Sequence, residues 1–255
     1  MNEDFHFVDG NLFGVFDGAT SLSPRVYENG VTGGFLASNI AGGTFRKNNN
    51  TIFDLAVNAN KAIGDAMVKR GVCLEQKHHR WNTSAAVVRI KKDVFEWIQI
   101  GDCLVLVIYK DGTHRVLTDN FDHDLETLKL WKESAPNTSE PLLSALKDQV
   151  IKVRGRMNID YGALNGEKEA VSFLNSGSGK LDGVLHIVLF TDGLFIPKQK
   201  PEERTDFTLF SELFQEGGLG SVRDFVRGIE KTDVTCRKYP RFKTHDDIAA
   251  ISLTF

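Results

Sequence analysis

Acidic residues stand beside apolar, strand-like runs at several points along this sequence. The run at residues 12–16 ends in Asp17-Gly18, and the run at residues 184–191 ends in Asp192-Gly193. A buried strand that ends this way delivers a carboxylate to the rim of its sheet. The same placement next to an apolar run recurs at three further points: Glu3-Asp4, Gly101-Asp102 and Asp246-Asp247.

Carboxylates gathered at strand ends are suited to hard divalent cations. Mg²⁺ and Mn²⁺ prefer oxygen ligands, and carboxylates held close together repel one another unless a cation compensates them. Two such ions can activate a water for attack on a phosphoryl group. The sequence therefore predicts a carboxylate cage for divalent cations. Taken singly, an Asp-Gly pair is more often an ordinary turn, and we assign no role to Asp111-Gly112 or Asp182-Gly183.

The bulk composition argues against several classes of protein. The chain has 255 residues, 41% of them hydrophobic, and a formal net charge of -3. These values favour one sizeable core and give no reason to expect binding to nucleic acid or to an anionic membrane. Its most basic segment, residues 237–243, is expected to be a solvated loop, with contact to a phosphorylated substrate as the alternative.

The cysteines and the chain's start point to a reducing compartment. Cys73, Cys103 and Cys236 show neither a disulfide framework nor zinc-ligand spacing, and no cysteine is expected to be a nucleophile. No apolar stretch has the length of a membrane span, and the N-terminus lacks the form of a signal peptide. A soluble, cytoplasmic protein is the expectation.

The first part of the chain predicts a hairpin followed by two helices. Residues 5–16 read as two strands around the turn Asp9-Gly10-Asn11. A helix is expected from Val31 that stops at Gly42-Gly43, and a second from Ile52 to Met67 with Thr51 as a candidate N-cap.

The remaining elements are predicted from changes in the apolar period. Residues 84–90, 94–100, 103–109 and 113–117 read as four strands joined by short turns, which predicts an antiparallel meander. Helices are expected at 125–131, 141–150, 207–214 and 222–229, and strands at 184–191 and 248–255. Between these, the polar, Gly-rich segment 152–182 is predicted to be a flap-like insertion.

An ordered set of motifs carries a resemblance over essentially the whole chain. The motifs are Asn2-Glu3-Asp4, Leu12 to Gly18, Ser84 to Val88, Ile100-Gly101-Asp102-Cys103, Leu189 to Phe195 and His245-Asp246-Asp247-Ile248. In this order the sequence resembles the metal-dependent protein serine/threonine phosphatases of the PPM (type 2C) family, in their bacterial single-domain form. The resemblance implies an α/β (α+β) sandwich of two antiparallel β-sheets flanked by helices in four layers (αββα), with residues 1–255 as one domain.

The resemblance also implies the site residues. Asp17 resembles the aspartate that bridges two metals, and Gly18 the residue whose carbonyl oxygen joins it, while Asp192 and Asp246 resemble the other aspartates of the first metal. Glu3 and Asp4 occupy the acidic pair near the second metal, with Asp4 slightly favoured. For a weak third ion the resemblance points to Asp122, with Asp119 as the competing alignment.

The implied activity is hydrolysis of phosphoserine or phosphothreonine in proteins by a water that bridges two Mn²⁺ or Mg²⁺ ions. Asp17, Asp192 and Asp246 are the expected catalytic residues, and a phosphorylated protein is the expected partner. Two family features are absent: the N-terminal arginine that grips the phosphate and a histidine after the bridging Asp-Gly. Arg25, Arg154 and Arg156 are candidate replacements for the arginine. These departures leave two alternatives open, a pseudophosphatase or regulatory binding module of the same fold, and a hydrolase of small phosphate esters.

Overall fold

The computed structural model describes residues 1–22, 25–118, 122–134 and 140–255. Its chain forms two compact units. The first unit contains residues 1–121, 156–192 and 247–255, and the second contains residues 122–155 and 193–246. All the strands described below belong to the first unit. In the described residues, no helix is long and apolar enough to cross a membrane.

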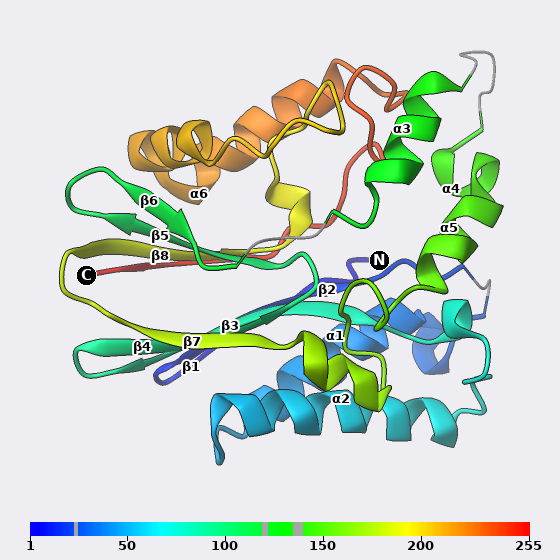
Figure 1. The fold of residues 1–255 in the computed structure, drawn as a ribbon, viewed down its shortest axis with the longest axis horizontal. Coiled ribbons are helices and arrows are strands. Elements are labelled where there is room, and N and C mark those ends of the chain that lie inside the picture. The colour runs from blue at the N-terminus through cyan, green and yellow to red at the C-terminus, as the bar shows by residue number, and fades with distance from the viewer. Residues whose placement is uncertain (23–24, 119–121, 135–139) are drawn as a thin grey trace. The chain divides into compact units, whose positions relative to one another are not determined.

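The first unit is built on two antiparallel sheets (Figure 1). One has five strands in the order β1-β2-β3-β4-β7, and the other has four in the order β6-β5-β8-β9. The five-stranded sheet consists of β1 (Phe5–Asp9), β2 (Leu12–Gly18), β3 (Thr83–Lys91), β4 (Val94–Ile100) and β7 (Asn175–Lys180). The four-stranded sheet consists of β5 (Leu104–Tyr109), β6 (His114–Val116), β8 (Val184–Phe190) and β9 (Ala250–Thr254). The expected fold class, antiparallel sheets with helices, is confirmed.

Alternate residues of the central strands face two different cores. Val15 of β2 and Val88 of β3 pack in a cluster that also contains Val105 and Leu189 of the other sheet, which places this core between the sheets. Phe16 of β2 faces the opposite way, into a second core. Because both faces are covered, these strands are apolar on both sides instead of alternating with polar residues.

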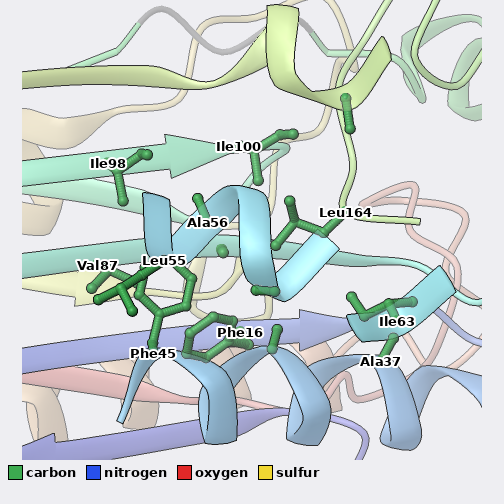
Figure 2. Packing of buried hydrophobic residues seen from close by; sticks show 14 of the residues in the cluster. Phe16, Ala37, Phe45, Leu55, Ala56, Ile63, Val87, Ile98, Ile100 and Leu164 are labelled. Carbon is green, nitrogen blue, oxygen red and sulfur yellow. The ribbon is translucent and has the colours of Figure 1, made fainter. Parts of the chain in front are cut away.

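Two helices close the second core on the outer face of the five-stranded sheet (Figures 1 and 2). They are α1 (Gly33–Phe45) and α2 (Ile52–Lys69). Phe45 of α1 and Leu55 of α2 meet Phe16 of β2 in one fully buried cluster. Thr51 caps α2 as predicted, since its hydroxyl accepts a hydrogen bond from the Asp54 amide at 3.1 Å.

The second unit is helical, and its longest helix is bent. It contains α3 (Leu125–Glu133), α4 (Leu142–Ala145), α5 (Lys147–Arg154) and α6 (Phe207–Lys231). Gly217 and Gly218 have non-helical backbone angles inside α6, so the two helices expected on either side of them are confirmed as the arms of a kinked one. Outside these helices, short 3-10 turns are found at Glu28–Gly30, Lys77–His79, Lys168–Phe173 and Asp192–Leu194, mostly in the first unit.

The meander prediction is wrong at Gly101-Asp102. Strand β4 pairs with β3 and β7, whereas β5 pairs with β6 and β8, so this turn crosses from one sheet to the other and is no hairpin. Gly101 has a φ of 75°, and a Cβ there would overlap the Ser84 side chain. The sharp crossing therefore requires glycine, which a turn-length argument could not distinguish from a hairpin.

Two other expectations about glycines are corrected by packing. Helix α1 continues through Gly42-Gly43 to Phe45, because Gly42 is the point where the Phe5 ring lies against the helix, and a Cβ would overlap that ring. In the segment predicted to be a flap, residues 175–180 form strand β7 on the edge of the five-stranded sheet. Gly177 and Gly179 of this strand lie over the rings of Trp97 and Phe95, so these glycines serve close packing.

Candidate metal centre

Asp17 and Gly18 stand at the end of β2, where the strand meets the start of α1. Asp17 pairs with Ser84 and Gly18 with Thr83 across the sheet. An added Cβ at Gly18 would overlap backbone atoms of Gly34 and the carbonyl oxygen of Glu3. The backbone at this predicted ligand is therefore packed directly against other backbone, which leaves no room for a side chain.

Glu3 is buried where the end of β2 meets the start of α1. Its side chain accepts hydrogen bonds from the hydroxyls of Thr20 at 3.0 Å and of Thr32 at 2.5 Å. Thr32 is the N-cap of α1, so the carboxylate lies at the positive end of that helix. Only 6% of Glu3 is exposed. Both carboxylate oxygens are thus already bonded within the protein.

The main chain of Glu3 contacts two further segments. Its carbonyl accepts from the Ser38 hydroxyl at 2.6 Å, and its amide donates to Asp247 at 2.8 Å. Asp247 is the neighbour of the predicted ligand Asp246. Glu3 therefore joins the first strand, α1 and the segment leading into β9.

Thr191, the residue between β8 and Asp192, binds Asp4. The Thr191 hydroxyl donates to Asp4 at 2.8 Å and accepts from the Ala249 amide at 2.9 Å. Thr191 is fully buried. Since its hydroxyl fixes Asp4, the two ends of the chain's first unit are held together at this threonine.

Several carboxylates of the first unit act on the buried Cys103 thiol. Burial raises the pKa of Cys103 well above its usual range, and nearby negative charges raise it further. Those charges belong to Asp17, Asp102, Asp4 and Asp192. Three predicted metal ligands and Asp102 therefore share one region of negative potential beside Cys103.

Asp102 is the residue that the sequence reasoning undervalued. The motif that contains Asp102 carries part of the resemblance, but Asp102 is not among the ligands that the resemblance implies. In the structure, Oδ1 of Asp102 is buried and has no hydrogen-bond partner among the described residues. A buried carboxylate oxygen without a donor is unfavourable unless a cation compensates it. The signal that could have found it is the place of Asp102 directly after a buried strand, which Asp17 and Asp192 share.

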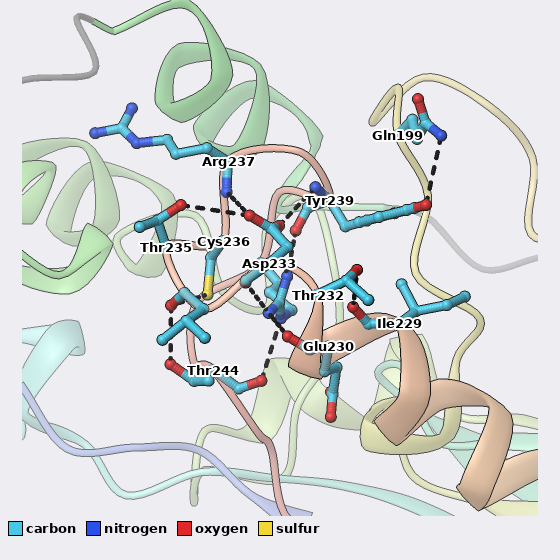
Figure 3. Close-up of polar contacts among 12 residues, drawn as sticks. Gln199, Ile229, Glu230, Thr232, Asp233, Thr235, Cys236, Arg237, Tyr239 and Thr244 are labelled. Carbon is cyan, nitrogen blue, oxygen red and sulfur yellow. Dashed lines mark hydrogen bonds and ion pairs between the residues drawn. The ribbon is translucent and has the colours of Figure 1, made fainter.

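Asp246 ends the loop that follows α6 in the second unit, and Asp233 organises this loop (Figure 3). The Asp233 carboxylate accepts from the amides of Arg237 at 3.1 Å and Tyr239 at 2.8 Å, and pairs with Arg241 at 2.9 Å. Burial raises the pKa of Asp233, but these hydrogen bonds outweigh it and the net pKa lies below its usual value. The basic segment 237–243 is accordingly no fully solvated loop: Arg237 also stacks on the Trp131 ring at 3.4 Å.

Of the remaining predicted residues, those that the structure describes contact other side chains or carbonyls. Asp122 belongs to the second unit, is exposed, and has Lys198 at 3.5 Å; Asp119 lies outside the described residues. Arg156 makes two hydrogen bonds to Asp160, at 2.6 and 2.7 Å, and Arg25 donates to the carbonyls of residues 70 and 71. Both guanidinium groups are therefore engaged within the chain.

The chemistry of the first unit fits a hard divalent cation. The converging groups are carboxylates, and the buried Asp102 oxygen has no donor in the part of the chain that the structure describes. Within the described ranges, no three His, Cys, Asp or Glu side chains form a group that could already hold a metal ion. The exact ligand set therefore remains a prediction.

Comparison with known proteins defines the class. A model of the family described as protein phosphatase 2C matches residues 2–221. The serine/threonine phosphatase PstP/Ppp of Mycobacterium tuberculosis superposes with a TM-score of 0.58 at 15% identity, over 99% of this chain and 91% of that one. Stp1 of Staphylococcus aureus gives 0.58 at 15% identity, over 100% and 89%. The PstP catalytic domain in complex with 2 manganese ions gives 0.56 at 14% identity, over 99% and 92%. A search of curated proteins finds no match.

The fold is thus that of the bacterial serine/threonine phosphatases. The chain belongs to the protein phosphatase 2C family, and so is a Mn²⁺- or Mg²⁺-dependent protein serine/threonine phosphatase. No finding favours the pseudophosphatase alternative.

Proposed function

We propose that the carboxylates converging beside Cys103 are the catalytic metal centre of this phosphatase, and that its substrates are proteins phosphorylated on serine or threonine. Asp17 and Asp192 are central ligands in this proposal, with the Gly18 carbonyl and Asp4 as further ligands. Asp246 is included as a third central ligand on the family resemblance alone. The observation that carries it is the shared influence of four carboxylates on one buried thiol.

We divide the acidic pair at the N-terminus between two tasks. Asp4 is the ligand, because it lies in the same negative region as Asp17 and Asp192. Glu3 is a support, because its oxygens accept the hydroxyls of Thr20 and Thr32 and it is almost fully buried.

Asp102 is our candidate for the additional weak ion. Its buried Oδ1 has no donor in the part of the chain that the structure describes, and it lies with Asp17 and Asp192 near Cys103. Asp122 remains the candidate implied by the sequence resemblance, and its observed neighbour is Lys198.

The chain's own groups would act by position and charge. The carboxylates hold the cations, which when bound neutralise the phosphoryl oxygens and lower the pKa of the attacking water. Thr191 keeps Asp4 oriented, and Glu3 keeps the Gly18 backbone in place. Cys103 stays protonated at neutral pH because its pKa is raised, so it supplies no nucleophile. The three free cysteines support a reducing, cytoplasmic location.

The test is hydrolysis of a phosphothreonine peptide with Mn²⁺, with Mg²⁺ and with EDTA. We expect metal-dependent turnover that Asp17→Asn abolishes. Asp111→Asn is the matched control, since Asp111 also precedes a glycine but is exposed at a surface turn. A metal-induced rise in melting temperature without turnover would support a binding module instead. Equal activity of the two variants would remove Asp17 from the centre.

A further inference from the structure

A lysine ammonium already neutralises one of the proposed metal ligands. Nζ of Lys243 lies 2.6 Å from Oδ1 of Asp246, and both side chains are 31% exposed. The two residues are three positions apart in the loop after α6, in the second unit. The carboxylate that the family resemblance assigns to a divalent cation is therefore already paired with a monovalent one.

The backbone of Asp246 is held separately from this ion pair. The Arg227 guanidinium donates to the Asp246 carbonyl and also to Glu230, at 2.6 Å. Glu230 is buried, and Nδ1 of His245 lies 2.8 Å from the same carboxylate oxygen. These contacts hold the main chain at Asp246 without involving Lys243.

We propose that the Lys243 ammonium is a tethered counter-cation that occupies Asp246 in the absence of metal and is displaced when a divalent cation binds there. Lys243 thereby lowers the metal affinity of the centre and sets the concentration of Mn²⁺ or Mg²⁺ at which it loads. This inference rests on the proposed function, which makes Asp246 a ligand.

Displacement follows from charge and from the kind of side chain. A divalent cation on Asp246 and an ammonium on the same carboxylate repel each other with twice the Coulomb energy of two unit charges. Lys243 has a flexible stem and is partly exposed, so its ammonium can return to water at little expense. Arg227 has no such freedom, because it binds the main chain and a buried glutamate.

The experiment is a calorimetric titration of Mn²⁺ into the full chain, wild type and variants, at one fixed ionic strength. Lys243→Met removes the competing charge, and we expect the dissociation constant to fall by about 2- to 5-fold, the range set by loss of one partly exposed ion pair. Lys243→Gln is a second neutral variant with the same expectation. Lys243→Arg keeps the charge and should bind Mn²⁺ no more tightly than wild type.

Lys129→Met is the matched control, because it makes the same change of charge on an exposed helical position of the same unit, with no effect expected on the dissociation constant. A second readout is thermal melting with EDTA. Lys243→Met should lower the melting temperature, since Asp246 loses its cation, and should enlarge the rise that Mn²⁺ produces.

Unchanged or weaker Mn²⁺ binding by both neutral variants, with wild type binding normally, would overturn the inference and leave the proposed metal centre intact. Weaker binding in particular would mean that Lys243 stays in place and orients Asp246 as a ligand. Absence of Mn²⁺ binding by wild type would overturn the metal centre and this inference together.

Discussion

The contact between α1 and the turn after β2 predicts a large difference between two glycine-to-alanine changes in the same helix. A Cβ at Gly34 would lie 2.5 Å from the Ala19 carbonyl oxygen, 2.8 Å from Oε1 of Glu3 and 2.9 Å from the Gly18 carbonyl carbon. A Cβ at Gly43 would meet nothing within 4 Å. Gly34→Ala and Gly43→Ala therefore add the same methyl group to one crowded and one open position.

The expected magnitudes follow from these surroundings. Gly43→Ala should stabilise the protein by about 0.5–1 kcal/mol, the ordinary preference for alanine in a helix. Gly34→Ala forces backbone apart, which costs about 1–3 kcal/mol, and disturbs the Glu3 hydrogen bonds as well. The two variants should differ by roughly 2–4 kcal/mol in the free energy of unfolding.

Urea unfolding at 25 °C with EDTA, followed by circular dichroism, measures this difference through the midpoints at constant slope. Because Gly34 also contacts the Gly18 backbone, Gly34→Ala should reduce the stabilisation that Mn²⁺ adds, whereas Gly43→Ala should preserve it. If Gly34→Ala were as stable as Gly43→Ala, the close packing of α1 on the predicted metal centre would be refuted.

Two further outcomes are expected. The lowered pKa of Asp233 means that its stabilising contacts are present above the usual aspartate pKa and are lost as pH falls through the lower folded-state pKa. Asp233→Asn should thus destabilise the protein at neutral pH, with a deficit in melting temperature that shrinks on acidification; a pH-independent deficit would contradict the role of its charge. In native protein, a thiol reagent should modify Cys73, which is exposed, and spare Cys103 and Cys236, which are buried and have raised pKa values. If peptide mapping found Cys103 labelled as fast as Cys73, the core between the two sheets would be accessible to solvent at Cys103.

The elements predicted best were those with a strong local pattern. The first hairpin, the amphipathic α2 with its Thr51 cap and the helix at α3 match the structure closely, because turn chemistry and apolar period act over a few neighbouring residues. The kink of α6 follows from Gly217-Gly218, which separate its two predicted arms.

The wrong predictions concern glycines that pack against side chains from distant parts of the sequence. Gly42 does not end α1; it lies inside the helix, where the Phe5 ring packs against it. Gly101 does not form a hairpin, because it turns the chain from one sheet to the other. A sequence pattern shows that a glycine is present but not which side chain from elsewhere approaches it. The same limit applies to Gly177 and Gly179 of β7, which pack on aromatic rings.

By itself, the sequence determined the class of protein, since carboxylates following apolar runs in a set order specify both the sheets and an oxygen-rich site. Only the tertiary structure decided what surrounds each of those carboxylates. It buried Glu3 at the start of α1 and set Lys243 on Asp246, and it gave Asp102 a buried oxygen with no donor among the described residues. The physical reason is that a carboxylate's role depends on the donors and charges around it, and those come from residues far away in the chain.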